Sequence, residues 1–270
     1  MVVQHNMSAM NANRMLSGVS SAQSKSTEKL SSGYKINRAG DDAAGLSISE
    51  KMRSQIRGLN KASDNAQDGI SLIQVAEGAL NETHSILQRM NELATQAAND
   101  TNTSVDRQSI KDEIEQLNEE LDRISTTTQF NKQDLLTGGF SGKLQVGALE
   151  GQTMDVKISL AVSAKGLKVS AVEVSTNVKA GDAMQSIQDA IESVSKQRSK
   201  LGAIQNRLEH TINNLDTNAE NTQAAESRIR DTDMADEMVQ YSKNNILSQA
   251  GQSMLTQANQ QTQGVLSLLQ

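Results

Sequence analysis

Residues 56–98 carry apolar side chains at alternating steps of three and four, the spacing that lines up one face of an α-helix. One line of this pattern is wholly apolar: Leu59, Ala66, Ile73, Leu80, Leu87 and Ala94. A parallel line also admits polar residues, namely Ser63, Glu77, His84 and Asn91. No proline occurs anywhere in the chain to break a helix. The pattern predicts a helix of roughly 65 Å in a bundle, rather than a strict two-stranded coiled coil.

Shorter patterns predict the remaining elements. A helix is expected around 110–124, with Asp106 near its N-cap, and another over about 184–229. Residues 140–176 instead alternate apolar and polar side chains, which is typical of strands. We expect strands at 144–146 and 154–160, joined by a turn at Glu150-Gly151, and a further strand at 167–171.

Aliphatic residues must fill the core, because the chain contains no Trp, only two Tyr and two Phe. Side chains of Leu, Ile, Val, Met and Ala suit long helices packed side by side. A mean hydropathy of −0.51 is low for a compact chain of this length and favours an elongated or assembling protein. The predicted fold is mainly α: an elongated bundle of long antiparallel helices with a small β-hairpin region, plus paired N- and C-terminal helices.

Both ends of the chain repeat apolar residues every three or four positions. Near the N-terminus these are Val3, Met7, Met10, Met15, Val19 and Ala22. Near the C-terminus they are Ile246, Leu247, Ala250, Met254, Ala258, Val265, Leu268 and Leu269. The termini of ordinary domains fray, because nothing holds them down. Apolar stripes at both tips therefore predict packing against other copies of the chain or another partner.

The remaining sequence argues against several functions. A net charge of −6 without blocks of like charge disfavours nucleic acid, and no run of 18 apolar residues exists to insert into a membrane. Residues 1–25 lack the pattern of a cleaved signal peptide. With no Cys, three unrelated His and no nucleophile motif, we predict no catalytic, cofactor-binding or metal-binding residues. Arg38, Asp41 and Asp42 lie among glycines, and we interpret them as helix-capping and ion-pairing residues.

The longest recognisable motif is Leu30–Ile48, LSSGYKINRAGDDAAGLSI. Others follow at Asn65–Ser71, Glu77–Glu82, Gln129–Asn131, Leu144–Ala148, Leu201–Leu208, Ala225–Asp233, Ala258–Gln260 and Val265–Leu269. In these motifs, and in their order, the chain strongly resembles the bacterial flagellins. The resemblance covers nearly the whole sequence and is very specific.

This resemblance implies a structural subunit that polymerises into the flagellar filament for motility. In the family, terminal helices form an inner tube, and long helices with a small sheet form the next layer. Here the inner domain would comprise residues 1–43 with 231–270, and the middle domain residues 44–230 with a β region at about 140–176. Only about 50 residues separate the flanking helices near Ser125 and Gly181, which leaves no room for an outer variable domain. The residues expected to pack in the filament core are Met7, Met10, Leu247, Met254, Val265, Leu268 and Leu269.

The resemblance also implies location and partners. The chain would be extracellular, in the flagellum, after type III export without a cleaved signal peptide. Its partners would be other copies of itself, an export chaperone, and the cap and hook-junction proteins. The alternative is a hook–filament junction protein, which shares the terminal helices. The flagellin-like middle segments favour the filament subunit.

Finally, the resemblance implies recognition by the innate immune receptor Toll-like receptor 5. The residues that match its epitope by position are Leu87, Gln88, Arg89, Leu93, Gln96, Ile110 and Glu113. Arg89 would be the central cation, able to donate several hydrogen bonds. It follows Leu87 by two residues, about 200° round the helix, so its side chain is predicted to face outwards.

Overall fold

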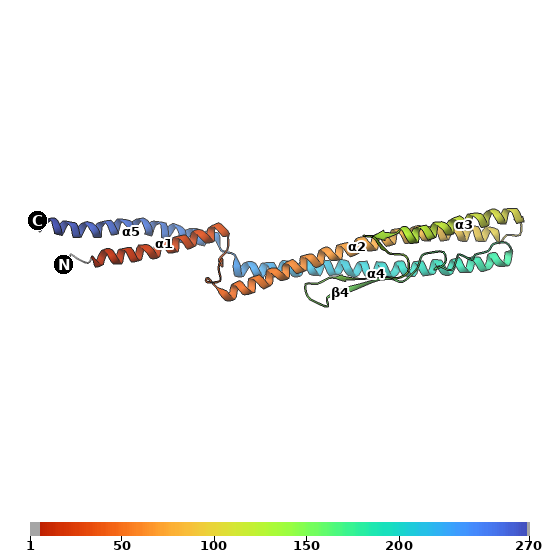
Figure 1. The fold of residues 1–270 in the computed structure, drawn as a ribbon, viewed down its shortest axis with the longest axis horizontal. Coiled ribbons are helices and arrows are strands. Elements are labelled where there is room, and N and C mark those ends of the chain that lie inside the picture. Colours follow the sequence, from red (N-terminus) through yellow and green to blue (C-terminus); the bar gives the residue numbers. More distant parts are fainter. Residues whose placement is uncertain (1–5, 269–270) are drawn as a thin grey trace. The chain divides into compact units, whose positions relative to one another are not determined.

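The computed structural model describes residues 6–268, with the backbone alone at residues 262, 263 and 265–268. Its helices are α1 (Met7–Ser32), α2 (Ala43–Ala97), α3 (Ser104–Thr127), α4 (Asn177–Arg230) and α5 (Met234–Leu268). Its strands are β1 (Gln129–Phe130), β2 (Gln133–Asp134), β3 (Phe140–Gln145) and β4 (Thr153–Ile158). The fold is mainly α with a small hairpin region, as predicted (Figure 1).

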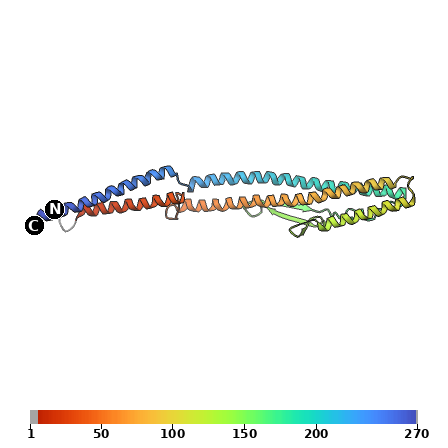
Figure 2. The same ribbon diagram turned by 90° about the horizontal axis from the view of Figure 1, so that it is seen from above.

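The chain divides into two compact units. The terminal unit comprises residues 1–54 and 221–270, and the central unit comprises residues 55–220, so α2 and α4 contribute to both. Within the terminal unit, α1 and α5 lie side by side and run in opposite directions (Figure 1). Within the central unit, α3 turns back alongside α2, and α4 runs antiparallel to α2 (Figure 2).

The apolar line predicted for α2 forms the core of the central unit. All six of its members are buried: Leu59, Ala66, Ile73, Leu80, Leu87 and Ala94. Ile114 and Leu121 of α3, and Ile187 and Leu201 of α4, are buried with them. The hairpins and turns add further members, such as Leu136, Val156 and Val169, so the helix pattern located the larger part of this core but not all of it.

Strands β3 and β4 form an antiparallel hairpin in which Phe140 pairs with Ile158 and Gln145 with Thr153. Its connection includes Gly151 at φ 84°, which confirms the turn expected at Glu150-Gly151. A second, smaller hairpin joins β1 and β2 and was not predicted. Its two central residues, Asn131 and Lys132, both adopt positive φ, as a type I′ turn requires.

The strand expected at 167–171 was wrong, because this segment consists of tight turns. The backbone N–H of Leu167 donates to the carbonyl of Ser163, and that of Val169 to the carbonyl of Ala164, each at 2.9 Å. Leu167 and Val169 are both buried. The turns therefore direct both side chains into the core. The alternation of apolar and polar residues at 167–171 thus resembles a strand pattern although no strand forms there.

Helix α2 begins at Ala43, earlier than the apolar pattern at 56–98 indicated. Asp42 precedes it, and its Oδ1 accepts a hydrogen bond from the backbone N–H of Gly45 at 3.0 Å, as an N-cap does. Ser49 is fully buried in the first turns and donates to Glu226 Oε1 at 2.8 Å. The buried position is thus filled by the Ser49 hydroxyl, with its partner Glu226, and not by an apolar side chain. The apolar pattern therefore did not extend to the first turns of α2.

Two glycines of α2 are expected to respond oppositely to alanine. A Cβ added at Gly78 would meet nothing within 4 Å, so Gly78→Ala should raise the free energy of unfolding by about 1 kcal/mol through helix propensity. At Gly58 a Cβ would lie 2.8 Å from Cβ of Ala148 and 3.3 Å from its Cα, so the same change must displace the hairpin loop. Denaturant unfolding should show a gain for Gly78→Ala and none for Gly58→Ala; equal gains would contradict this packing.

Candidate assembly and recognition surfaces

The terminal helices pair through small and polar side chains together with a few larger ones. The half-buried positions of α1 include Ala9, Ala12, Leu16, Val19 and Gln23, and those of α5 include Tyr241, Ser248, Gly251, Leu255 and Ala258. A Cβ on Gly251 would lie 3.2 Å from Cδ1 of Leu16, and Asn6 Nδ2 donates to the carbonyl of Ala258 at 2.9 Å. The pairing therefore uses little of the apolar surface that both helices carry.

The larger apolar side chains of both helices remain exposed. Met7 and Met10 on α1 are 70% and 63% exposed, and Ile246 and Met254 on α5 are 66% and 61% exposed. Ile246 precedes half-buried Ser248 by two residues, which places it on the other side of the helix. Leu247 is also exposed. The structure thus leaves Met7, Met10, Leu247 and Met254 available for contacts, while their packing stays a prediction.

The other three predicted core-packing positions cannot be placed in this way. Val265 and Leu268 lie in α5, but their side chains are outside the described part of the chain, and so is Leu269 as a whole.

A groove of about 480 Å³ runs between α1 and α5 within the terminal unit. Its apolar lining comes from Met15, Leu16, Val19, Leu247 and Met254. The surrounding sequence carries almost no charge: none of residues 244–270 is charged, and Arg14 is the one charged side chain among residues 1–24. The groove can therefore accept apolar side chains without placing a charge in contact with them.

The acidic pair before α2 has structural partners. Asp41 forms an ion pair with Lys25 at 2.8 Å, and its Oδ2 accepts hydrogen bonds from the backbone N–H groups of Asn37 and Arg38. Arg38 donates to Glu28 Oε1 at 2.8 Å. Together with the cap formed by Asp42, these contacts confirm the interpretation of Arg38, Asp41 and Asp42 as ion-pairing and capping residues.

The Asp41 carboxylate should make the terminal unit sensitive to acid. The Lys25 ammonium, together with the N–H groups of Arg38 and Asn37, lowers the pKa of Asp41 from 3.8 to about 2. A carboxyl whose pKa is lower in the folded state stabilises that state above its unfolded pKa and loses the effect as pH falls towards the folded pKa. We expect Asp41→Asn to lower stability at pH 6, with the difference from the parent shrinking between about pH 4 and pH 2. Melting curves across this range would measure it; a difference independent of pH would contradict it.

The seven residues that match the receptor epitope separate into two groups. Leu87, Leu93 and Ile110 are buried in the core of the central unit, so their side chains are not available to a partner. Gln88, Arg89, Gln96 and Glu113 are exposed. We call these four the recognition surface. This separation has a simple cause: Leu87 occupies the apolar line of α2, and Leu93 and Ile110 belong to the same core cluster.

Arg89 points outwards, as its position predicted, but it is not free. Its Nε and Nη2 donate to Glu113 Oε1 at 3.0 and 2.9 Å, and its Nη1 donates to Glu92 Oε2 at 3.3 Å. Glu113 and then Glu92 raise the pKa of Arg89. The pair with Glu113 links α2 to α3. The family resemblance did not identify Glu92 as a partner of Arg89, although Glu92 follows Arg89 by one helical turn.

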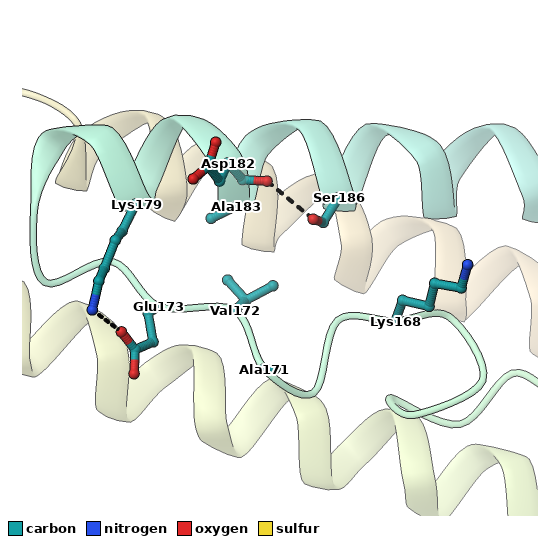
Figure 3. A pocket seen from close by; sticks show the side chains of 8 residues that line it. All are labelled: Lys168, Ala171, Val172, Glu173, Lys179, Asp182, Ala183 and Ser186. Carbon is teal, nitrogen blue, oxygen red and sulfur yellow. Dashed lines mark hydrogen bonds and ion pairs between the residues drawn. The ribbon is translucent and has the colours of Figure 1, made fainter.

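Another pocket of the central unit, about 300 Å³, lies between α4 and the turns at 168–173 (Figure 3). Glu173 and Lys179 form an ion pair at one end, and the Ser186 hydroxyl donates to the carbonyl of Asp182 at 3.0 Å. Glu173 and Lys179 thus neutralise each other, and none of the predicted site residues lines the pocket. We assign no ligand to it.

Two further findings concern metal binding and membrane insertion of the described residues. Among residues 6–268, no three His, Cys, Asp or Glu side chains gather as a metal site would require. Across the same residues, every helix is too short or too polar to cross a bilayer.

The family models match both halves of the sequence. The bacterial flagellin N-terminal helical region matches residues 3–141, and the C-terminal helical region matches residues 184–269. A flagellin of Halalkalibacterium halodurans is 55% identical, with all of both chains covered. A flagellin of Bacillus subtilis is 50% identical, again over all of both chains. A flagellar filament 31.3 kDa core protein of Treponema maltophilum is 51% identical over the same extent.

Solved structures agree with these relatives. The crystal structure of Bacillus cereus flagellin is 33% identical and superposes with a TM-score of 0.51, covering 60% of this chain and 94% of that one. A putative flagellar hook-associated protein of Vibrio parahaemolyticus reaches a TM-score of 0.61 over 71% of this chain and 100% of its own, but at 14% identity it shares the fold alone. The chain therefore belongs to the bacterial flagellin family and is a structural subunit of the extracellular flagellar filament, not an enzyme.

Proposed function

We propose that this flagellin polymerises through its terminal helices, which pack against those of neighbouring subunits. The observation that carries the proposal is the set of large apolar side chains that the α1–α5 pair leaves exposed, including Ile246 and Met254. Exposed apolar surface of this kind is an interaction site or an aggregation hazard. A repeated contact that does not close on itself turns it into a helical filament.

Two layers suffice for this subunit: an inner domain of residues 1–43 with 231–270, and a middle domain of residues 44–230. No outer variable domain is included. The segment between α3 and α4 supports this arrangement, because it holds two short hairpins and tight turns. By resemblance, the subunit leaves the cell by type III export without a cleaved signal peptide. It would meet an export chaperone and then the cap and hook-junction proteins.

The alternative is a hook–filament junction protein. Full-length relatives that are themselves called flagellins favour the filament subunit, whereas the hook-associated structure resembles this chain in fold only. Electron microscopy of the purified chain, seeded with filament fragments, separates the two. A filament subunit extends the seeds into long tubes; a junction protein attaches to their ends without elongation.

The second proposed role is recognition by Toll-like receptor 5 through Gln88, Arg89, Gln96 and Glu113. Support comes from their match to the family epitope and from their exposure on two adjacent helices. Leu87, Leu93 and Ile110 then contribute from beneath, by fixing the spacing of α2 and α3. A receptor that binds Arg89 must share it with Glu113 or displace that carboxylate.

We expect Arg89→Ala to weaken receptor binding without unfolding the subunit. A hydrogen bond to a charged group is typically worth about ten- to a hundredfold in affinity. Stability should hardly change, because exposed ion pairs contribute little. Binding should be measured on monomers, so that filament contacts do not interfere.

Arg123→Ala is the matched control. Arg123 is also exposed, pairs with Glu120 one turn away, and lies outside the recognition surface. Equal receptor affinity of Arg89→Ala and Arg123→Ala would remove Arg89 from the proposed contact.

A further inference from the structure

Two connectors meet in the terminal unit: residues 33–42 between α1 and α2, and residues 231–233 between α4 and α5. The backbone N–H of Lys35 donates to the carbonyl of Arg230 at 2.6 Å, and that of Thr232 donates to the carbonyl of Gly33 at 3.0 Å. Tyr34 and Asp231 form an antiparallel bridge between them. The connectors thus form a short ladder, although they lie nearly 200 residues apart in sequence.

Arg230, the last residue of α4, joins this ladder to the first turns of α2. Its guanidinium carbon lies 4.6 Å from the ring centroid of Tyr34, within the range of a cation–π contact. Its Nη1 donates to Glu50 Oε1 at 2.9 Å and to Ser49 Oγ at 3.4 Å. The side chain is only 11% exposed, which is unusual for a charged residue and requires partners.

A second polar contact strengthens the same junction. Ser49, fully buried in α2, donates to Glu226 of α4, so the two helices are tied one turn away from Arg230. Glu50 is about half exposed and can stay hydrated without Arg230. Arg230 is the one cation that stacks on the ring of Tyr34 among the described residues. Loss of the Arg230 side chain would therefore loosen the first connector while leaving α2 and α4 joined through Ser49 and Glu226.

We propose that Arg230 is a latch: by holding Tyr34 and Glu50 at once, it makes both connectors order together and fixes the register in which α1 meets α5. That register is marked by contacts along the pair, such as Lys29 with Glu237 at 3.4 Å and Asn6 with Ala258. When Arg230 does not contact Tyr34 and Glu50, each connector can move independently. Subunits with misaligned terminal helices cannot join a filament end.

A simpler role for Arg230 is that of a cation near a helix C-terminus, which favours the helix dipole. Arg228 separates the two roles. It lies in the same last turn of α4, carries the same charge, and is exposed. Within the described residues it forms no ion pair. Arg228→Ala removes the dipole contribution but leaves the latch intact.

The test is hydrogen exchange of the full chain, followed by mass spectrometry. In Arg230→Ala, amides of residues 33–54 and 231–240 should exchange roughly tenfold faster or more, the factor typical of a hydrogen bond to a charged group. Residues 80–94 should exchange at the parental rate, which shows that the central unit stays folded. Arg228→Ala should match the parent throughout. Equal exchange in the two arginine variants, or faster exchange over the whole chain, would overturn the latch.

Two further variants test the stacking itself. Tyr34→Phe keeps the ring and should behave as the parent, whereas Tyr34→Ala should accelerate the same segments as Arg230→Ala. Seeded filament growth should be slowed by Arg230→Ala and Tyr34→Ala but not by Arg228→Ala. Parental growth rates of both latch variants would overturn the role in register.

Discussion

Leu87→Ala is expected to lower the free energy of unfolding by about 2–5 kcal/mol. The side chain has no exposed surface and lies among Met90, Ile114 and other core residues of the central unit. Truncation removes its transfer free energy and leaves a cavity that rigid helices fill only in part. Denaturant unfolding followed by circular dichroism would measure the loss.

Leu149→Ala provides the matched comparison. Leu149 follows β3 in the hairpin loop and is 68% exposed, so the same truncation should change stability by no more than about 0.5 kcal/mol. Similar losses for Leu87 and Leu149 would contradict the position of Leu87 in the core. Receptor affinity measured well below both melting temperatures should then stay close to parental for Leu87→Ala, because the leucine supports the recognition surface only from beneath.

The double change Ile246→Gln with Met254→Gln is expected to raise the critical concentration for filament growth about a hundredfold or more. Each side chain contributes about 1.5–3 kcal/mol when fully buried, and both are exposed in the single subunit. The helices themselves should persist, because glutamine is a good helix former and both side chains are largely exposed in the single subunit, Met254 at the edge of the α1–α5 groove. Sedimentation of seeded filaments at increasing protein concentration would measure the change.

Ser253→Gln is the control for this pair. Ser253 is exposed on α5 close to Met254, so the change introduces the same side chain without removing apolar surface. Growth of Ser253→Gln should remain near the parental level. Filament growth of the double variant at the parental critical concentration would exclude apolar packing by these residues.

Sequence periodicity identified the parts of the fold that depend on uniform apolar spacing. Every position of the apolar line from Leu59 to Ala94 proved buried, because a long helix presents one face to the bundle along its whole length. The first turns of α2 escaped prediction, since Ser49 is buried there by a hydroxyl contact with Glu226, 177 residues away. No local pattern records such a partner.

The recognition surface shows the same division between local and distant information. That Arg89 faces outwards follows from its angle to Leu87, and the structure agrees. Its link to Glu113 spans 24 residues and two helices, so it became visible only in three dimensions. The burial of Leu87 follows from its position in the apolar line of α2. Family resemblance by position, in contrast, does not distinguish a side chain that contacts the receptor from one that supports such a side chain.

The nearly uncharged ends of α1 and α5 have a consequence for the environment in which this flagellum can be built. Contacts between surfaces without charge offer no Coulomb attraction for dissolved ions to screen. Apolar burial is instead strengthened by strongly hydrated anions such as sulfate, which are excluded from protein surfaces. If subunits pack through these surfaces as proposed, the stability of the filament should depend little on the Coulomb screening that dissolved salt provides.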